Sequence, residues 1–215
     1  MTEVPIHQIV CIDEAGGIGL NGGLPWSIEK DWQYFLQHSL RLLNPEKPSV
    51  CWILGRASYQ LHSQKNGLFE DLEKKVKIIK IVLSRKWKEV PQNCENTYLA
   101  QSWLDVETTV QSLKDKISEA WNIGGPKVYE AQLLWNTDKR SLADSSRGAK
   151  LFLTKLHQAF QCDTFYPGQY LEKLQYIEDE KDVIWAEENG VKLSFHVNDL
   201  QQITLSGRHK AKKSM

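Results

Sequence analysis

The sequence predicts an α/β fold: a single domain with a mostly parallel central sheet flanked by helices and a C-terminal antiparallel hairpin. Short apolar runs alternate with segments of helical spacing, an order that is typical of parallel sheets. The last two apolar segments flank a turn sequence, which adds an antiparallel edge. The 215 residues contain no internal repeat and no interdomain linker. We therefore expect one domain over residues 1–205 and a basic, disordered tail over residues 206–215.

The predicted strands are short runs of apolar residues, many of them β-branched, as is typical of buried strands. They cover residues 4–12, 49–54, 76–83, 120–123 and 151–156. Two further segments, 182–187 and 191–197, alternate around Glu188-Asn189-Gly190 and predict a β-hairpin.

The helical spacing of apolar residues predicts four helices between these strands. They cover residues 28–42, a short stretch from Arg56, residues 102 to about 117, and a segment from Pro126. Ser102 and Asp105 resemble a capping box, and a proline suits a first helical turn because it has no N–H to leave unpaired. Residues 13–25, which are rich in glycine, and the polar residues 136–150 are expected to be loops.

The composition argues against several classes of function. The formal net charge is +0, so no long-range field attracts nucleic acid or an anionic membrane. No apolar run approaches the roughly 20 residues of a membrane span, and the N-terminus does not resemble a signal peptide. The tail over residues 206–215 is basic, which indicates a solvated segment, with a nuclear-targeting or nucleic-acid-binding patch as the alternative.

The four cysteines, Cys11, Cys51, Cys94 and Cys162, form no C-x-x-C pair, and no His/Cys cluster has the spacing of metal ligands. Buried free thiols are the interpretation that this pattern favours. We expect a cytoplasmic, monomeric protein with no metal ion and no membrane or nucleic-acid partner.

The glycine-rich segment from Gly17 to Gly22 fits the G-x-G-x-x-G pattern of dinucleotide-binding proteins. Its context argues against that interpretation, because the segment continues into Gly23, Leu24 and Pro25, where no helix can begin to face a pyrophosphate. No carboxylate follows at the expected distance of about 20 residues. The segment is better interpreted as a lid over a ligand, followed by a helix with Asp31 on an otherwise apolar face. A first-turn aspartate that only complements the helix dipole is the structural alternative.

Five ordered blocks together resemble the dihydrofolate reductase family, over about residues 4–200. They are Ile9–Ile12 with Gly17–Trp26 and Asp31, then Val50–Tyr59, Ile81–Arg85, Trp121–Tyr129, and Leu151–Thr154 with Asp163–Pro167. The resemblance implies that NADPH is the cofactor and that a hydride passes to C6 of 7,8-dihydrofolate while N5 is protonated. Dihydrofolate and antifolate-type inhibitors are then the expected ligands.

The resemblance also implies roles for individual residues on the pterin side. Asp31 would accept two hydrogen bonds from the amino-amidine edge of the pterin and assist N5 protonation through a water held by Trp26. The implied catalytic residues are Asp31, Trp26, Leu24 and Thr154. The implied substrate contacts are Ile9, Cys11, Asp31, Trp32, Phe35, Ser58, Asn66, Lys77, Ile123 and Thr154.

On the cofactor side, the resemblance implies a cis peptide bond between Gly124 and Gly125, and backbone N–H groups from Gly125 to Tyr129 that receive the pyrophosphate. Arg56, Ser84 and Arg85 would contact the 2′-phosphate and favour NADPH over NADH. The implied cofactor contacts are Cys11, Ile18, Gly19, Asn21, Gly22, Gly23, Leu24, Gly55, Arg56, Ala57, Ser58, Leu83, Ser84, Arg85, Ile123, Gly124, Gly125, Pro126, Lys127, Val128 and Tyr129.

Two positions depart from the family pattern. The family has an arginine that grips the folate α-carboxylate where this sequence has Ile78. A bulge that brings in Lys77, a substitute base such as Arg41 or Lys80, or weak binding of the glutamate tail are the alternatives. Gln101 stands where many relatives have a further arginine on the phosphate side, which weakens the expected preference for NADPH.

Three functions remain open from the sequence. The first is an active dihydrofolate reductase that supports one-carbon metabolism and thymidylate synthesis. The second is another pterin or pyrimidine reductase of the same fold, and the third is a non-catalytic module that binds NADPH or folate. The Leu24-Pro25-Trp26 segment together with Asp31 and Thr154 favours the first.

Overall fold

A computed structural model of the protein describes residues 3–63, 70–90, 96–137, 148–175 and 183–205. The strands are β1 (Ile6–Ile12), β2 (Gly17–Gly19), β3 (Ser49–Gly55), β4 (Lys77–Leu83), β5 (Thr97–Ala100), β6 (Ala120–Gly124), β7 (Lys150–Leu156), β8 (Thr164–Phe165), β9 (Ile184–Glu188) and β10 (Val191–Asp199). The helices are α1 (Glu29–Ser39), α2 (Arg56–His62), α3 (Glu70–Glu73), α4 (Trp103–Ser112), α5 (Pro126–Thr137), α6 (Gly168–Gln175) and α7 (Leu200–Leu205).

Eight strands form one sheet in the order β5-β4-β3-β6-β1-β7-β10-β9. All neighbours from β5 to β7 are parallel, whereas β10 is antiparallel to both β7 and β9. This arrangement confirms the predicted mostly parallel sheet and its C-terminal hairpin. The hairpin turns at Asn189 and Gly190, which both have positive φ (52° and 78°), as a two-residue turn requires.

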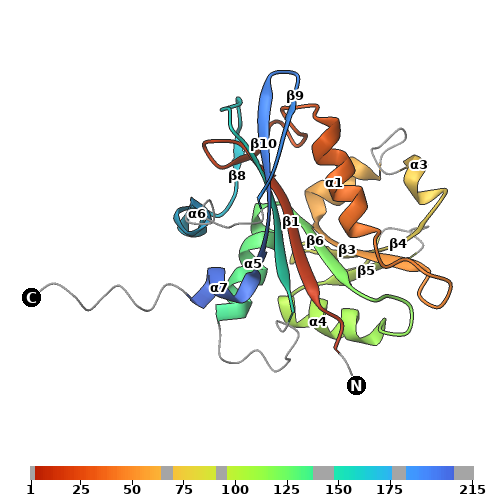
Figure 1. The fold of residues 1–215 in the computed structure, drawn as a ribbon. Coiled ribbons are helices and arrows are strands. Elements are labelled where there is room, and N and C mark those ends of the chain that lie inside the picture. The colour runs from red at the N-terminus through yellow and green to blue at the C-terminus, as the bar shows by residue number, and fades with distance from the viewer. Residues whose placement is uncertain (1–2, 64–69, 91–95, 138–147, 176–182, 206–215) are drawn as a thin grey trace, which may run out of the picture.

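Helices cover both faces of the sheet (Figure 1), and the alternation of side chains along the strands decides which residues meet which helix. In β3, Cys51 and Ile53 pack with Trp103 and Val106 of α4. Val50 and Trp52 face the other way, toward the apolar side of α1. A further core of apolar residues joins β1 and β7 to α5, α6 and α7. The carboxyl ends of the parallel strands therefore emerge between two helical layers.

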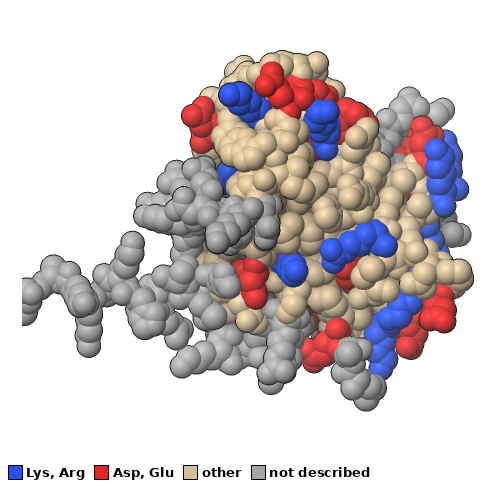
Figure 2. Space-filling view, viewed as in Figure 1, with Lys and Arg blue, Asp and Glu red and all other residues tan. Residues whose placement is uncertain are grey.

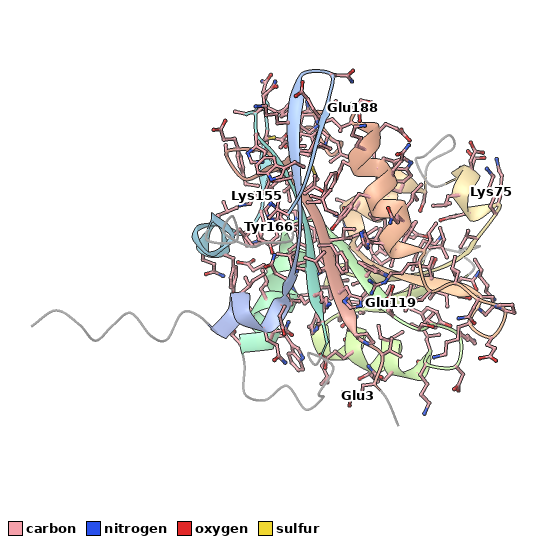
Figure 3. The ribbon with its side chains drawn as sticks, in the orientation of Figure 1. Glu3, Lys75, Glu119, Lys155, Tyr166 and Glu188 are labelled. Carbon is pink, nitrogen blue, oxygen red and sulfur yellow. The ribbon has the colours of Figure 1, made fainter. Side chains whose placement is uncertain are left out.

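The start of α1 is held by a residue that is distant in the sequence. Ile28 precedes the helix and offers no side-chain cap. Instead, the two carboxylate oxygens of Glu188 accept the backbone N–H groups of Glu29 and Lys30, each at 2.8 Å. Figure 3 shows Glu188 at the β9–β10 hairpin beside α1. The C-terminal hairpin thus caps the helix that carries Asp31.

The structure also contains elements that the hydrophobic pattern did not predict. β2 lies within residues 13–25, which were expected to form a loop, and it pairs with β8. The sequence also did not predict β5, α3, α6 and α7. These elements are two to eight residues long, too short for a periodic pattern to be recognised. The helix expected to reach about residue 117 ends at Ser112. The chain continues in turns that bury Ile117 completely, so the apolar pattern extends beyond the end of the helix.

In Figure 2, basic and acidic side chains are interspersed on the visible face and form no continuous patch of one sign. Among the described helices, none has the length and apolar character to cross a membrane. Within the same residues, no group of three or more His, Cys, Asp and Glu side chains could hold a metal ion.

Candidate active site

Asp31 lies in the first turn of α1, opposite two neighbouring strands of the sheet. The side chains of Thr154 and Cys11 both hydrogen-bond to its carboxylate. These two residues are directly paired in the register between β1 and β7, so one position of the sheet supplies both partners. Thr154 is buried, whereas Asp31 and Cys11 are partly buried. The sequence predicted this grouping of Asp31 with Thr154, but it gave the Cys11 side chain no role beside the carboxylate.

Burial raises the pKa of Asp31 from its ordinary value of 3.8 to about 6, against the opposing effect of the hydrogen bonds from Thr154 and Cys11. Burial, together with the nearby Asp31 charge, raises the pKa of the Cys11 thiol well above its usual range. The thiol therefore stays protonated and can donate to the carboxylate. A carboxyl group with a pKa near neutrality can both hold and release a proton, which is the property that acid–base chemistry requires.

Trp26 lies at the end of the glycine-rich loop, in an apolar cluster that Cys11 packs against. Its ring is buried against Phe160, with ring centroids 5.3 Å apart. Its Nε1–H group is also buried and donates to no group among the described residues. A buried donor without an acceptor is costly, and a bound water or ligand atom would satisfy it. Leu24, two residues earlier, is 56% exposed and so belongs to the open side of the loop.

An apolar wall extends from Asp31 along α1. Trp32 and Phe35 stack with their ring centroids 5.3 Å apart, and Phe35 continues to Trp52 of β3 at 5.4 Å. Ile9 and Ile123 belong to the same cluster, on adjacent strands. The expected substrate contacts Ile9, Trp32, Phe35 and Ile123 therefore lie together, beside Asp31. Asn66 lies outside the described residues.

A groove of about 780 Å³ opens at the carboxyl ends of the parallel strands. In open parallel sheets this edge is where ligands bind, and the volume suits a large ligand. Fifteen expected cofactor contacts line it: Ile18, Gly19, Gly22, Gly23, Gly55, Arg56, Ala57, Ser58, Leu83, Ser84, Arg85, Gly125, Pro126, Lys127 and Val128. The lining does not include Cys11, Asn21, Leu24, Ile123, Gly124 or Tyr129.

Gly124 and Gly125, beside the groove, lie in tightly packed surroundings. The peptide bond between Gly124 and Gly125 is cis, as the sequence predicted. Gly124 has a φ of 91°, and a Cβ atom there would lie 2.5 Å from the Tyr129 ring. Tyr129 is itself buried, with its hydroxyl donating to the Ile9 carbonyl at 2.9 Å. The N–H groups of Val128 and Tyr129 donate to the Gly125 carbonyl, which leaves the groove-lining backbone of Gly125 and Lys127 as the better-placed part of the turn for a pyrophosphate.

Cationic and hydroxyl groups gather at one part of the groove. Arg56 and Arg85 line it, and no ion pair joins either guanidinium to a carboxylate in the described part of the chain. Ser84 is buried, and its Oγ accepts the N–H groups of Lys86 and Trp87 at 3.3 Å, which leaves the O–H free to donate. These groups fit a phosphate monoester, because unpaired guanidiniums bind such an anion by direct hydrogen bonds.

The groove also contains residues that the sequence did not assign to it: Ser102, Trp103, Glu130, Ala131, Leu134 and Thr164. The first two follow β5, a strand that the hydrophobic pattern did not reveal. The others lie on α5 or on β8, whose positions depend on the folded sheet. Gln101 lines the groove as well, with its side-chain amide directed to the Trp87 carbonyl.

The structure does not place Lys77 with the other expected substrate contacts. β4 pairs with β3 in an unbroken register from Lys77 to Leu83, so no bulge turns the lysine. Ile78 packs in the cluster beneath Trp32 and Phe35, and Lys77, one residue earlier, points to the opposite face of the sheet. Arg41 is bound to Glu119 at 2.8 Å. Lys80 lies on the correct face but forms an ion pair with Glu73 at 2.7 Å.

The lid segment is tied to the late part of the chain. β2 pairs with β8, and the backbone N–H of Asn21 donates to Asp163 at 2.8 Å. Asp13, buried beneath the loop, accepts the N–H groups of Ala15, Gly17 and Phe160. Ile18, Gly19, Gly22 and Gly23 line the groove, so this segment borders it. Such a position suits a loop that covers a ligand.

A model of the dihydrofolate reductase family matches residues 5–199. The chain belongs to the dihydrofolate reductase family. It is 32% identical to the dihydrofolate reductase of Sus scrofa over 200 residues, which cover 90% of this chain and 96% of the relative. It is 30% identical to the enzyme of Rattus norvegicus over 197 residues, with the same shares, and 29% identical to that of Drosophila melanogaster over 198 residues, which cover 89% and 95%. The match covers both the Asp31 side and the groove.

Proposed function

We propose that this protein reduces 7,8-dihydrofolate to 5,6,7,8-tetrahydrofolate with NADPH, and so supports one-carbon metabolism and thymidylate synthesis. The observation that carries the proposal is the position of Asp31, a carboxyl group with a pKa of about 6 beside an apolar aromatic wall and next to a groove for a dinucleotide. Membership of the dihydrofolate reductase family supports the same activity.

On the pterin side, Asp31 orients the substrate by accepting two hydrogen bonds from its amino-amidine edge. Thr154 and Cys11 hold the carboxylate from the strand side. The unpaired Nε1–H of Trp26 binds the water through which a proton reaches N5. Ile9, Trp32, Phe35 and Ile123 enclose the ring and exclude other water, which strengthens the electrostatic contacts within the site.

On the cofactor side, bound NADPH supplies the hydride for C6. Arg56, Ser84 and Arg85, which line the groove, would bind its 2′-phosphate and so distinguish it from NADH. The backbone of Gly125 and Lys127 receives the pyrophosphate at the start of α5. The backbone of Cys11 and Ile18 would hold the nicotinamide end, and the loop from Gly19 to Leu24 would cover it.

The folate tail is held weakly in this proposal. Ile78 provides no charge for the α-carboxylate, and the two bases considered as substitutes, Arg41 and Lys80, are already paired with Glu119 and Glu73. Steady-state kinetics with dihydrofolate and with a pterin that lacks the glutamate test this point. A small preference for dihydrofolate in kcat/KM is expected, whereas a preference of a hundredfold or more, about 2.7 kcal/mol, would contradict weak binding.

The proposed compartment is the cytoplasm. In the described part of the chain, Cys11, Cys51 and Cys162 are free thiols, which suits a reducing compartment. Cys94 lies outside the described residues. Fractionation of cells that express the tagged full chain tests the proposal, and recovery in a membrane or secreted fraction would contradict it.

The activity itself is tested by following NADPH consumption with dihydrofolate as substrate. The wild-type protein is expected to turn over, and Asp31→Asn is expected to lose roughly 10²–10⁴-fold in kcat/KM. Asp115→Asn, the same change at an exposed position, is the matched control and should keep the activity. If the wild type binds NADPH without turnover, the chain is a binding module. If it reduces another pterin but not dihydrofolate, it is a related reductase.

A further inference from the structure

A fully buried amide occupies a place in the sheet where an apolar side chain is the normal choice. β6 is flanked by β1 and β3, and its middle residue, Asn122, is 0% exposed. A buried amide costs free energy unless its oxygen and its N–H groups are hydrogen-bonded. The partners of Asn122 therefore show what this position does.

The side chain of Asn122 spans the turn that leads from β6 into α5. Its Oδ1 accepts the backbone N–H of Gly124 at 3.0 Å. Its Nδ2 donates to the carbonyl of Val128 at 3.1 Å. One side chain thus ties the last residue of the strand to the first turn of the helix. The residues between these two anchors, Gly125 to Lys127, line the groove.

Asn122 is itself held in one orientation by further buried amides. Its Nδ2 also donates to Oε1 of Gln132 at 2.8 Å, and that oxygen accepts Nε2 of Gln8 at 3.1 Å. Nε2 of Gln132 donates to the Ile6 carbonyl at 2.8 Å. Because backbone groups anchor both ends, rotating either amide by half a turn would place donor against donor or acceptor against acceptor. The network therefore fixes the Asn122 side chain.

The far end of the network lies at Tyr166, whose hydroxyl donates to Oε1 of Gln8. Tyr166 is labelled in Figure 3, and it packs in the core that faces α5 and α6. Its backbone N–H donates to the Gly16 carbonyl at 2.9 Å, immediately before β2. The hydrogen bonds thus connect the turn between β6 and α5 to Gly16, at the base of the lid segment.

The turn needs such support because it cannot position itself. Gly124 and Gly125 have no side chains to pack, and Pro126 has no N–H to donate. We propose that Asn122, oriented by Gln132, is a positioning residue that sets the groove-facing backbone of Gly125 and Lys127 for the pyrophosphate. The inference rests on the proposed function, since it assumes that this groove binds NADPH.

The experiment measures equilibrium binding of NADPH and of dihydrofolate separately, together with the unfolding temperature, for the full chain. Asn122→Leu keeps the approximate volume and removes every hydrogen bond, and Asn122→Asp is a milder second variant in case the first fails to fold. Gln132→Leu tests the orienting residue. Asn198→Asp is the matched control, because this buried asparagine pairs with Leu151 at the other end of the sheet.

The Kd for NADPH is expected to rise roughly tenfold or more in Asn122→Leu, less in Asn122→Asp and Gln132→Leu, and not in Asn198→Asp. The Kd for dihydrofolate should change less than threefold in all of them. An equal loss of affinity for both ligands, or a lower unfolding temperature with unchanged NADPH affinity, would overturn the positioning role. Failure of the wild type to bind NADPH would overturn the proposed function instead.

Discussion

Two carboxylates lie at opposite ends of α1, and their surroundings differ. Glu119, near the C-terminal end of the helix and labelled in Figure 3, is buried and has charged and polar donors around it. Arg41 binds it at 3.1 and 2.8 Å, His7 at 3.2 Å and the Trp121 ring N–H at 3.2 Å. Within the described residues, Asp31, in the first turn, receives only a hydroxyl and a thiol.

The pKa values of the two groups follow from these surroundings. Burial would raise the pKa of Glu119, but the hydrogen bonds and charges of His7 and Arg41 lower it below its ordinary value. Among the residues that the structure describes, no cation contributes to the pKa of Asp31, so burial dominates and raises it to about 6. A carboxylate that the protein has already neutralised serves stability, whereas one left with an unsatisfied charge is available to a substrate. The difference separates a structural carboxylate, Glu119 beside the start of β6, from a catalytic one, Asp31 on α1.

The largest expected effect on stability comes from replacing Glu119, whose charge its protein partners neutralise. Glu119→Gln leaves the partly exposed Arg41 without its carboxylate and should cost about 2–3 kcal/mol of the free energy of unfolding. The kcat for dihydrofolate should stay within a factor of about three at temperatures where the variant is folded. Denaturant unfolding measures the first quantity. Glu46→Gln, an exposed control, should leave both unchanged, and a large loss of kcat in Glu119→Gln would break the division between the two sites.

Removing the charge of Asp31, which has no cationic partner among the described residues, should have the opposite effect on stability. The folded-state pKa of Asp31 lies above its unfolded value, so the folded protein binds more protons than the unfolded chain between about pH 4 and pH 6. Stability contributed by this group is therefore lost as the pH rises through that window. Asp31→Asn should be more stable than the wild type at neutral pH, by roughly 2 kcal/mol, while losing activity. A less stable Asp31→Asn would show that the carboxylate is structurally satisfied.

The pH dependence of hydride transfer sharpens the comparison further. The single-turnover rate should fall as the pH rises through about 6, because the protonated form of Asp31 is then lost. Thr154→Val removes a hydrogen bond that lowers this pKa, so the inflection should move upward by up to about one pH unit. Cys11, Tyr34 and Tyr129 interact electrostatically with Asp31, and because their pKa values are all raised they stay protonated near pH 6. An inflection that moves downward in Thr154→Val would refute the assigned hydrogen bond.

The smallest expected effect concerns the cap of α1. Hydrogen bonds from the backbone N–H groups of Lys30 and Glu29 lower the pKa of Glu188. Its contribution is therefore present above the unfolded pKa and is lost as the pH falls through the lower folded value. Glu188→Gln should reduce kcat/KM by roughly two- to fivefold through a less ordered first turn. Glu187→Gln, the same change one residue earlier, should have no effect, and equal effects in both variants would exclude a specific cap.

Sequence patterns correctly predicted the features that depend on a few neighbouring residues. The apolar runs predicted the parallel strands, and Asn189-Gly190 predicted the hairpin, because two residues determine such a turn. Most of the groove residues were implied only by the resemblance to the dihydrofolate reductase family, which rests on five ordered blocks. The short strand β5 was missed because four residues carry no clear period, and the groove residues behind it were missed with it.

Contacts between distant residues could not be predicted from patterns. Arg41 was considered for the folate tail, but its partner Glu119 is 78 residues away in the sequence. Lys77 was assigned to the site although a shift of one residue in a strand reverses the face. Asn122 gave no signal as part of an apolar strand, because its purpose depends on Gln132 and Gln8, which only the folded sheet brings together.

The contact between Glu188 and α1 has a consequence for how the protein is made. The carboxylate that caps the first turn of α1 follows that turn by 159 residues. During synthesis the N-terminal part of the chain emerges first, so α1 leaves the ribosome long before the hairpin that completes it. A nascent chain that stops before β9 would carry Asp31 on an uncapped helix. We expect such truncated chains to bind a pterin poorly, so that the active site matures only when the final strands have been released.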